Sequence, residues 1–462
     1  MNGLTKKIIL LVVAAALVVA GIFVPIDGLS HEGTISLFIM LAGVVLWVGG
    51  VMPLAVTGFL LMLLLIVLNV ATANDVVAGF MNATMLFILF VFSFGTVLKK
   101  TPFSQKLVGV VLKISKGNSS LICLGYLLVG CVMSMFMANL AVVAILLPIG
   151  VSILEALGQP KLKSHMGKIM LMGLPIAAMV GGAGTPIGHP MNALCNSMLE
   201  QITGISVNFG IWCLVGIPVA IVVMILTFLI LKLMFKPEPI SEEQFKALVE
   251  KFNDIPPATA KDKFALVSLV VLVVMLIAGT WIPLLSVLNV GLLGIIWFMF
   301  PGVEILTWDE FVGGIAWDVF FMFGSVSAVI QVMLKTGAAD WLANALVSLV
   351  SGPGFVIALA LTVIACIIVV FFPVGPSLLP VMFSPFLGLI AASGMPEACI
   401  PILLAFTLGS GFVLAINPPM LISMGSGYWK SNELVVPGIA TTVMFAIVVG
   451  LGVPGILLLV GA

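Results

Sequence analysis

The chain has 462 residues, of which 62% are hydrophobic and only 8% are charged, and its mean hydropathy is +1.35. Soluble domains carry about 25% charged residues, so this composition excludes a soluble protein and indicates an all-α polytopic membrane protein. Eighteen lysines balance eighteen acidic residues, and a net charge of zero gives no sign of a nucleic-acid partner. Because the chain contains no arginine, any anion would be bound by backbone amides, hydroxyls and side-chain amides rather than by a guanidinium fork.

The apolar segments predict about 11 transmembrane helices, since a bilayer core of about 30 Å needs roughly 20 residues per helix. They lie near residues 8–24, 35–50, 53–70, 83–99, 167–200, 209–235, 264–283, 289–303, 317–334, 399–429 and 436–460. Two further apolar runs, about 119–150 and 353–388, are interpreted as re-entrant hairpins. A stretch with 11 charged residues in 28, residues 236–263, predicts a cytoplasmic linker between two halves.

The second half repeats the order of elements in the first. In each half a span ends in a lysine-containing sequence, Leu98–Thr101 or Leu334–Thr336, and an amphipathic stretch follows. A hairpin, a helix interrupted by glycine and proline, and a final span come next. We therefore predict two structural repeats, residues 1–235 and residues 264–462.

The lysines predict how these repeats are oriented. If both apolar runs enter and leave the membrane on one side, the N-terminus is cytoplasmic and 17 of the 18 lysines lie inside, as the positive-inside rule expects. Lys335 is the exception. The first hairpin then opens from the cytoplasm and the second from outside, so the repeats are expected to be inverted relative to each other.

Two interrupted helices, near 167–200 and 399–429, predict where a ligand binds. Gly181–Asn192 reads GGAGTPIGHPMN, and Gly409–Met420 reads GSGFVLAINPPM. Irregular backbone at membrane depth is tolerated only where it is buried in protein or lines a water-filled cavity, because its polar groups need hydrogen-bond partners. Two such interruptions at corresponding places in two halves are the best sequence-level indication of a transporter's binding site.

The hairpin tips carry polar residues that could complete this site. Ala138-Asn139 lies at the first tip, and Gly375 and Ser377 lie at the second. We expect the second tip to be irregular, since four closely spaced prolines preclude an unbroken helix there: Pro373, Pro376, Pro380 and Pro385.

The interruptions have the chemistry of a site for a cation and an anion. Unwound segments free backbone carbonyls, which suit sodium, a hard cation. The N-termini of half-helices present unpaired N–H groups and a positive dipole end, which suit an anionic group. Because these four segments contain no carboxylate, a carboxylate proton relay is not expected there.

These features resemble the divalent anion/sodium symporters of the ion transporter superfamily, and the most specific part is Asn417-Pro-Pro-Met-Leu-Ile-Ser-Met-Gly-Ser-Gly-Tyr428. The resemblance implies homodimers and sites in which hairpin tips and unwound segments bind sodium and the carboxylates or sulfate of the substrate. It implies sodium near Asn139, Gly184, Ser377 and Asn417. The other positions that it assigns to substrate or ion binding are Ala138, Thr185, Pro186, His189, Asn192, Gly375, Pro418 and Pro419. The family's hairpin tips carry the sequence Ser-Asn-Thr. In this chain the first tip keeps only the asparagine of that sequence, and the second tip has no asparagine.

His189 supports an alternative. It replaces a threonine of the family's Thr-Pro-Pro-Asn sequence, and an imidazole at membrane depth is a functional candidate. When protonated, it could couple transport to protons or to exchange; equally, it could be a neutral histidine hydrogen-bonded between helices.

We therefore expect a secondary active transporter of a small anion, such as a dicarboxylate, another carboxylate, sulfate or a sulfonate. Its coupling ion would be sodium and no other cofactor is expected. An intramembrane enzyme would need a catalytic constellation at depth, and the three histidines lie far apart in the chain. The expected location is the plasma (inner) membrane, in contact with lipid.

Overall fold

The computed structural model describes residues 3–253, 257–347, 352–372 and 375–461. Within these ranges the regular structure is entirely helical. The first part of the chain forms α1 (Gly3–Phe23), α2 (His31–Val48), α3 (Leu54–Val67), α4 (Ala73–Phe80), α5 (Ala83–Lys100), α6 (Phe103–Ser115), α7 (Ser119–Ser134), α8 (Asn139–Ala156), α9 (His165–Gly182), α10 (Pro190–Thr203) and α11 (Phe209–Met234).

The charged linker contains one amphipathic helix, α12 (Glu242–Asn253). The second part forms α13 (Ala260–Ala278), the 3-10 turn η1 (Pro283–Leu285), α14 (Val287–Met299), α15 (Trp308–Gly314), α16 (Trp317–Lys335), α17 (Ala338–Val347), α18 (Gly354–Phe371), α19 (Gly375–Ala392), α20 (Cys399–Leu408), α21 (Pro418–Met424) and α22 (Ser431–Val460). Among the described residues, ten helical segments are long and apolar enough to cross a membrane, and α3, α7, α14 and α20 are shorter apolar helices. The prediction of a polytopic helical membrane protein is confirmed.

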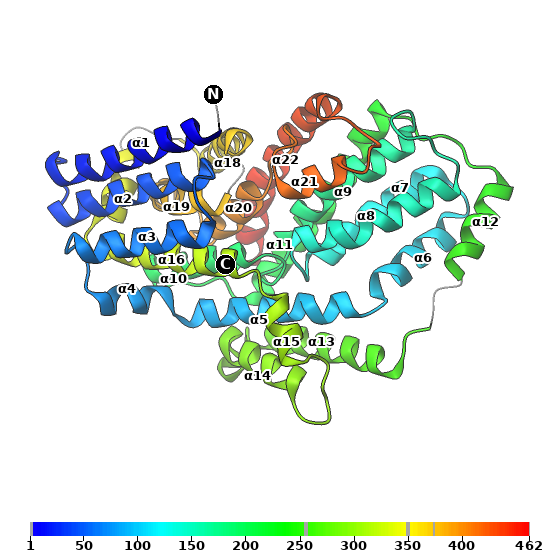
Figure 1. The fold of residues 1–462 in the computed structure, drawn as a ribbon, viewed down its shortest axis with the longest axis horizontal. Coiled ribbons are helices and arrows are strands. Elements are labelled where there is room, and N and C mark those ends of the chain that lie inside the picture. Colours follow the sequence, from blue (N-terminus) through cyan, green and yellow to red (C-terminus); the bar gives the residue numbers. More distant parts are fainter. Residues whose placement is uncertain (1–2, 254–256, 348–351, 373–374, 462) are drawn as a thin grey trace.

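The two halves have the same order of elements, and each half packs against the other through equivalent helices. The series from α2 to α11 corresponds to the series from α13 to α22. Helix α3 packs on α16, and its counterpart α14 packs on α5, the counterpart of α16. Figure 1 shows the first hairpin, α7 and α8, at one end of the molecule with α6, α9 and α12, whereas α1 to α4 lie at the other end with α16 and α19. The inversion of the halves across a membrane stays a prediction.

Two ion pairs at equivalent positions also connect the halves. At the end of α5, Lys100 Nζ lies 2.6 Å from Glu310 Oε1 at the start of α15. At the end of α16, the counterpart of α5, Lys335 pairs with Asp75 of α4, the counterpart of α15. Each acid also belongs to the capping box of its helix. The hydrogen bond from Lys100 lowers the pKa of Glu310, and the N–H groups at the helix start also favour its charged form.

The hairpins pack against the interrupted helices: α7 and α8 lie on α9, and α18 and α19 lie on α20. One expectation about the second hairpin was wrong, because α19 runs unbroken from Gly375 through Pro380 and Pro385. Pro376 is the second residue of α19, where an N–H has no intrahelical acceptor, so proline is tolerated there. Pro380 and Pro385 each remove one hydrogen bond, but both are buried where α19 packs against α17 and α20. Pro373 lies outside the described residues.

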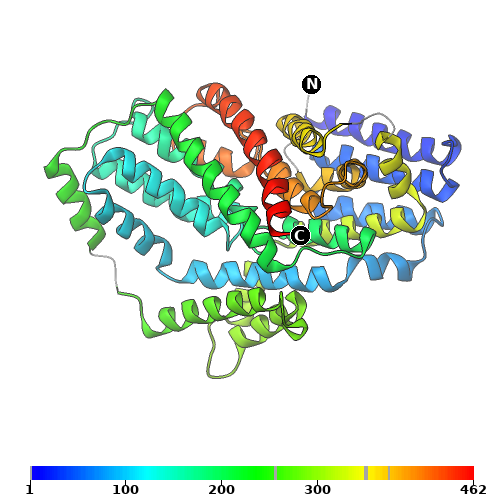
Figure 2. The ribbon, with the colours of Figure 1, turned by 180° about the vertical axis from the view of Figure 1, so that it is seen from behind.

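Both interrupted helices are contacted by a glycine of a long final helix. We call residues 183–189 the first break and residues 409–417 the second break. A Cβ on Gly216 of α11 would lie 2.4 Å from Gly184 O in the first break, and a Cβ on Gly438 of α22 would lie 2.4 Å from Phe412 O in the second. Helices α11 and α22 also pack on each other, and Figure 2 shows them side by side at the centre of the molecule.

This contact predicts that Gly438→Ala destabilises the protein, whereas Gly452→Ala on the same helix does not. The methyl group at 438 would overlap a backbone carbonyl, and overpacking of this kind costs about 1–3 kcal/mol. The nearest atom to a Cβ at 452 lies 3.5 Å away, at ordinary van der Waals distance. Thermal unfolding of the purified variants in one detergent checks this, and equal melting temperatures would contradict the packing.

Candidate functional site

A cavity of 580 Å³ lies where the hairpins and the breaks meet. One side of it is formed by the start of α8, the start of α19 and both breaks, and the other side by residues of α3, α5 and α16. Seven of the twelve site residues predicted from sequence line this cavity, namely Ala138, Asn139, His189, Gly375, Asn417, Pro418 and Pro419. The other five do not line it: Gly184, Thr185, Pro186, Asn192 and Ser377.

In the first break, the amide of Asn192 replaces missing helix hydrogen bonds. Its Nδ2 donates to Gly182 O and to Thr185 O, each at 2.7 Å. Trp212 Nε1 donates to Ala183 O at 3.0 Å. Carbonyls expected to be free for a cation thus accept hydrogen bonds from side chains, because a buried carbonyl without a partner is costly. Asn192 is fully buried and has a structural role in this conformation.

One acceptor beside the first break, in the first turn of α10, stays unpaired. Asn192 Oδ1 is buried and has no hydrogen-bond partner among the residues that the structure describes. Such an orphaned oxygen is a candidate ligand for a hard cation. Thr185 donates its hydroxyl to Met135 O at the first hairpin tip, so this tip and the first break are joined directly.

His189 is the N-cap residue of α10. Its Nδ1 accepts the Met191 N–H at 3.1 Å, so in this conformation the neutral ring carries its proton on Nε2. Among the described residues, Nε2 has no hydrogen-bond partner and is available to the cavity. The ring meets Phe323 edge-on, with centroids 6.5 Å apart. Protonation of Nδ1 would remove the acceptor that caps the helix, because an imidazolium has only donors.

Asn139 is the first residue of α8 and faces the cavity. Its Oδ1 accepts from Ser134 Oγ at 2.9 Å, and its Nδ2 has no partner within the described parts of the chain. No side chain there caps the start of α8, so the N–H groups of its first turn also face this region. A Cβ on Gly182 would lie 2.2 Å from Asn139 Oδ1, which explains why the end of α9 needs glycine.

The second break is built on similar principles. Asn417 caps α21: its Oδ1 accepts the Met420 N–H at 3.0 Å, and its Nδ2 donates to Gly411 O at 2.9 Å. At the start of α19, a Cβ on Gly375 would lie 2.0 Å from Leu408 O. Ser377 is fully buried within α19. Each break thus has a capping side chain, His189 or Asn417, that faces the same cavity.

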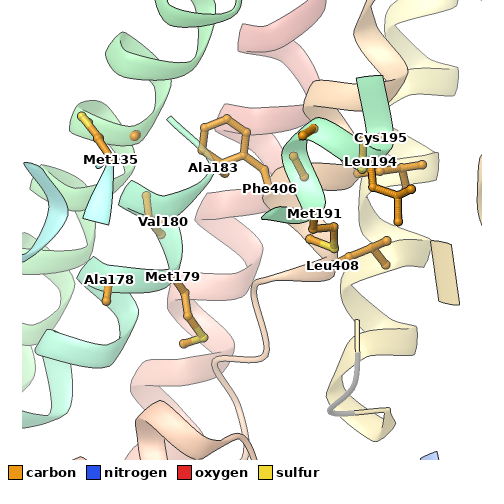
Figure 3. Close-up of a cluster of buried hydrophobic side chains, with 14 of the residues drawn as sticks. Met135, Ala178, Met179, Val180, Ala183, Met191, Leu194, Cys195, Phe406 and Leu408 are labelled. Atoms are coloured by element: carbon orange, nitrogen blue, oxygen red, sulfur yellow. The ribbon is translucent and has the colours of Figure 1, made fainter. Parts of the chain in front are cut away.

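Apolar side chains form the rest of the site. Figure 3 shows Met191 and Leu408 close to each other, and Met179 apart from them on a different helix, within a buried apolar cluster. These three residues also line the cavity. The opposite wall includes Phe92 of α5 and Phe323 of α16. Sequence reasoning missed this wall, because its residues lie in ordinary apolar spans that carry no local signal.

The described residues contain no group of three or more His, Cys, Asp or Glu side chains that could hold a metal ion.

Comparison with known proteins agrees with this architecture. A family model described as citrate transporter matches residues 44–373. The chain belongs to the citrate transporter family. It is therefore a multi-pass membrane transporter rather than an enzyme, and the resemblance to the divalent anion/sodium symporters is confirmed.

The similarity to known relatives covers most of the chain. The chain is 25% identical over 424 residues to an uncharacterized transporter of Haemophilus influenzae, covering 88% of each chain. It is 24% identical to the sodium-dependent dicarboxylate transporter SdcS of Staphylococcus saprophyticus, over 73% of this chain and 69% of that protein. The solved structure of Neisseria gonorrhoeae MtrF, described among antimetabolite efflux pumps, shares the fold with a TM-score of 0.59 and 14% identity, over 98% of this chain and 94% of MtrF.

The hydrogen bonds of Asn192 predict that Asn192→Asp destabilises the transporter strongly. The substitution keeps the side-chain size but places a carboxylate oxygen against two carbonyls that now accept from Nδ2. Leaving buried polar groups unpaired costs about 1–3 kcal/mol each, and more for a charged group. Yield after size-exclusion chromatography and thermal stability are the measurements. Asn289→Asp, at an exposed position, serves as the matched control, and equal behaviour of the two variants would contradict the assigned role.

Proposed function

We propose that this protein is a secondary active transporter that carries small carboxylates together with sodium. The observation that supports this best is the position of the cavity: the hairpin starts and breaks form one wall, and helices α3, α5 and α16 form the other. A binding site at the junction of two repeats, beside discontinuous helices, is typical of secondary transporters. A relative that is 24% identical in sequence is named as a sodium-dependent dicarboxylate transporter.

In this proposal, a carboxylate binds at the start of α8. Asn139 Nδ2 and the unpaired N–H groups of the first turn supply donors, and the positive end of the helix dipole favours an anion. His189 Nε2 supplies a further donor to the same cavity. Hydrogen bonds to a charged acceptor contribute about 1.5–3 kcal/mol each, so a few such donors can bind a carboxylate without arginine.

The proposed sodium sites lie beside the same elements, near Asn139 and Gly184 in one half and near Ser377 and Asn417 in the other. In the first half, the orphaned Asn192 Oδ1 adds an oxygen close to the carbonyls of Gly182 and Thr185. A sodium ion near the hairpin start would offset the charge of the carboxylate. This proximity would make binding of the two ions cooperative.

Transport would move the hairpins and interrupted helices as a unit against the remaining helices, which would expose the cavity to each side in turn. We propose that the N-terminus is cytoplasmic, in agreement with the positions of 17 of the 18 lysines. We further propose location in the plasma (inner) membrane and assembly as a homodimer.

The proposal predicts sodium-dependent uptake of a labelled carboxylate into proteoliposomes. An inward sodium gradient should drive accumulation, and an equal potassium gradient should not. Asn139→Ala should weaken apparent substrate affinity about tenfold or more, because it removes a donor to a charged group. Asn289→Ala, at an exposed position that does not line the cavity, is the matched control. Uptake that is equally fast in sodium and potassium would refute the proposed coupling.

The cap on α10 also predicts how His189 contributes. Asparagine and threonine are good N-cap residues, whereas leucine is not. His189→Asn and His189→Thr should therefore keep sodium-driven uptake, with a lower substrate affinity because the Nε2 donor is lost, and His189→Leu should lose stability and activity. Rates measured from pH 6 to pH 8 should change little in the wild type. If His189→Asn instead abolishes a strong pH dependence, proton-coupled or exchange-type carriage through His189 is the better description.

A further inference from the structure

The cavity is polar on one side and apolar on the other. Three polar side chains line it, Asn139, His189 and Asn417, and all belong to the hairpin start or to the caps beside the breaks. Most of the other lining residues are aliphatic, aromatic or methionine side chains. Among the described residues that line the cavity, none carries a formal charge.

This lining is unfavourable for a cargo with several negative charges. A carboxylate removed from water needs hydrogen bonds or an opposite charge, and an unpaired one costs many kcal/mol. The polar groups near Asn139 and His189 can satisfy one carboxylate. On the side of the second break, Asn417 already uses both atoms of its amide in hydrogen bonds to the backbone, and Pro418 and Pro419 have no N–H to donate. On the opposite wall, a second carboxylate would face Phe92, Met322 and Phe323, which offer neither donors nor positive charge.

The size of the cavity leads to the same conclusion. Its 580 Å³ lies within the range of sites that enclose drug-sized ligands, about 300–1,000 Å³. A compact dicarboxylate would leave much of this space against apolar walls. A cargo with an apolar body would fill it and would gain about 0.8 kcal/mol for each buried methylene.

We infer that the cargo is an amphiphilic monocarboxylate, with a single anionic head and a branched aliphatic or aromatic body. This inference rests on the proposed function and specifies its substrate class. The head binds at the start of α8, beside Asn139. The body packs against Phe92, Val319 and Phe323, while Met179 and Met191 adapt to bodies of different shape, as flexible thioethers do.

The test measures binding by thermal stabilisation of the purified transporter in sodium, over a series of 2-oxo acids. Pyruvate, 2-oxobutyrate, 2-oxopentanoate, 2-oxohexanoate and phenylpyruvate differ only in their apolar body, and they stay ionised at neutral pH. Succinate and citrate are the comparison ligands. We expect affinity to rise about threefold or more for each added methylene, until the cavity is filled.

Two variants show whether the cavity is responsible. Ala144 lines the cavity, and Ala144→Phe should weaken binding of 2-oxohexanoate and phenylpyruvate at least tenfold while pyruvate is unaffected. Val319→Thr keeps the side-chain shape and should reduce the gain per methylene through its hydroxyl group. Ala360→Phe, at an exposed position of α18 outside the cavity lining, is the matched control and should bind the series like the wild type.

The outcomes separate this inference from the proposed function. Affinity that is flat along the series, or highest for succinate or citrate, overturns the inference and leaves sodium-driven carboxylate transport standing. Affinity that rises along the series but is the same in Ala144→Phe, Val319→Thr and the wild type also overturns the inference, because the apolar body then binds outside this cavity. Failure of sodium to drive uptake of any of these acids refutes the proposed function, while the binding series still decides the chemistry of the cavity.

Discussion

The structure depends on one constraint: backbone groups must be hydrogen-bonded wherever a helix stops at membrane depth. At the first break, Asn192 and Trp212 donate to the carbonyls that the interrupted helix leaves, and His189 accepts an N–H at the start of the next helix. At the second break, the amide of Asn417 both donates to a backbone carbonyl and accepts a backbone N–H. These side chains let irregular backbone persist beside a cavity, and the same backbone gives the cavity its polar wall.

Close backbone contact is the second requirement, and glycine satisfies it. Gly216 and Gly438 let the two long final helices contact the breaks, and Gly375 lets the second hairpin contact Leu408 O. Gly216 and Gly438 correspond to each other in the two halves, as do the ion pairs of Lys100 and Lys335. The repeat is therefore visible in the contacts of the structure as well as in the order of its elements.

The sequence predicted the helical class and the places where two helices are interrupted, because glycine and proline act locally on the backbone. That the two hairpins are re-entrant stays a prediction. The sequence predicted less well what each polar residue does. For Asn192, the sequence could not show that Nδ2 supports the break, because this depends on where the carbonyls of Gly182 and Thr185 lie in the folded chain. The prolines of α19 interrupt helix hydrogen bonds as expected, but burial of α19 maintains the helix. The apolar wall from α3, α5 and α16 could not be predicted, since residues on those spans look alike until tertiary packing brings some of them to the cavity.

The contact between Gly375 and Leu408 O has a mechanical consequence. A backbone-to-backbone contact this close has no flexible side chain between its partners, so the start of α19 cannot slide over the end of α20 without exposing polar backbone. The Thr185 hydrogen bond to Met135 O imposes a similar restriction on the first hairpin. Each hairpin is thus held directly against its neighbouring break, and separating the two would leave polar backbone groups without partners.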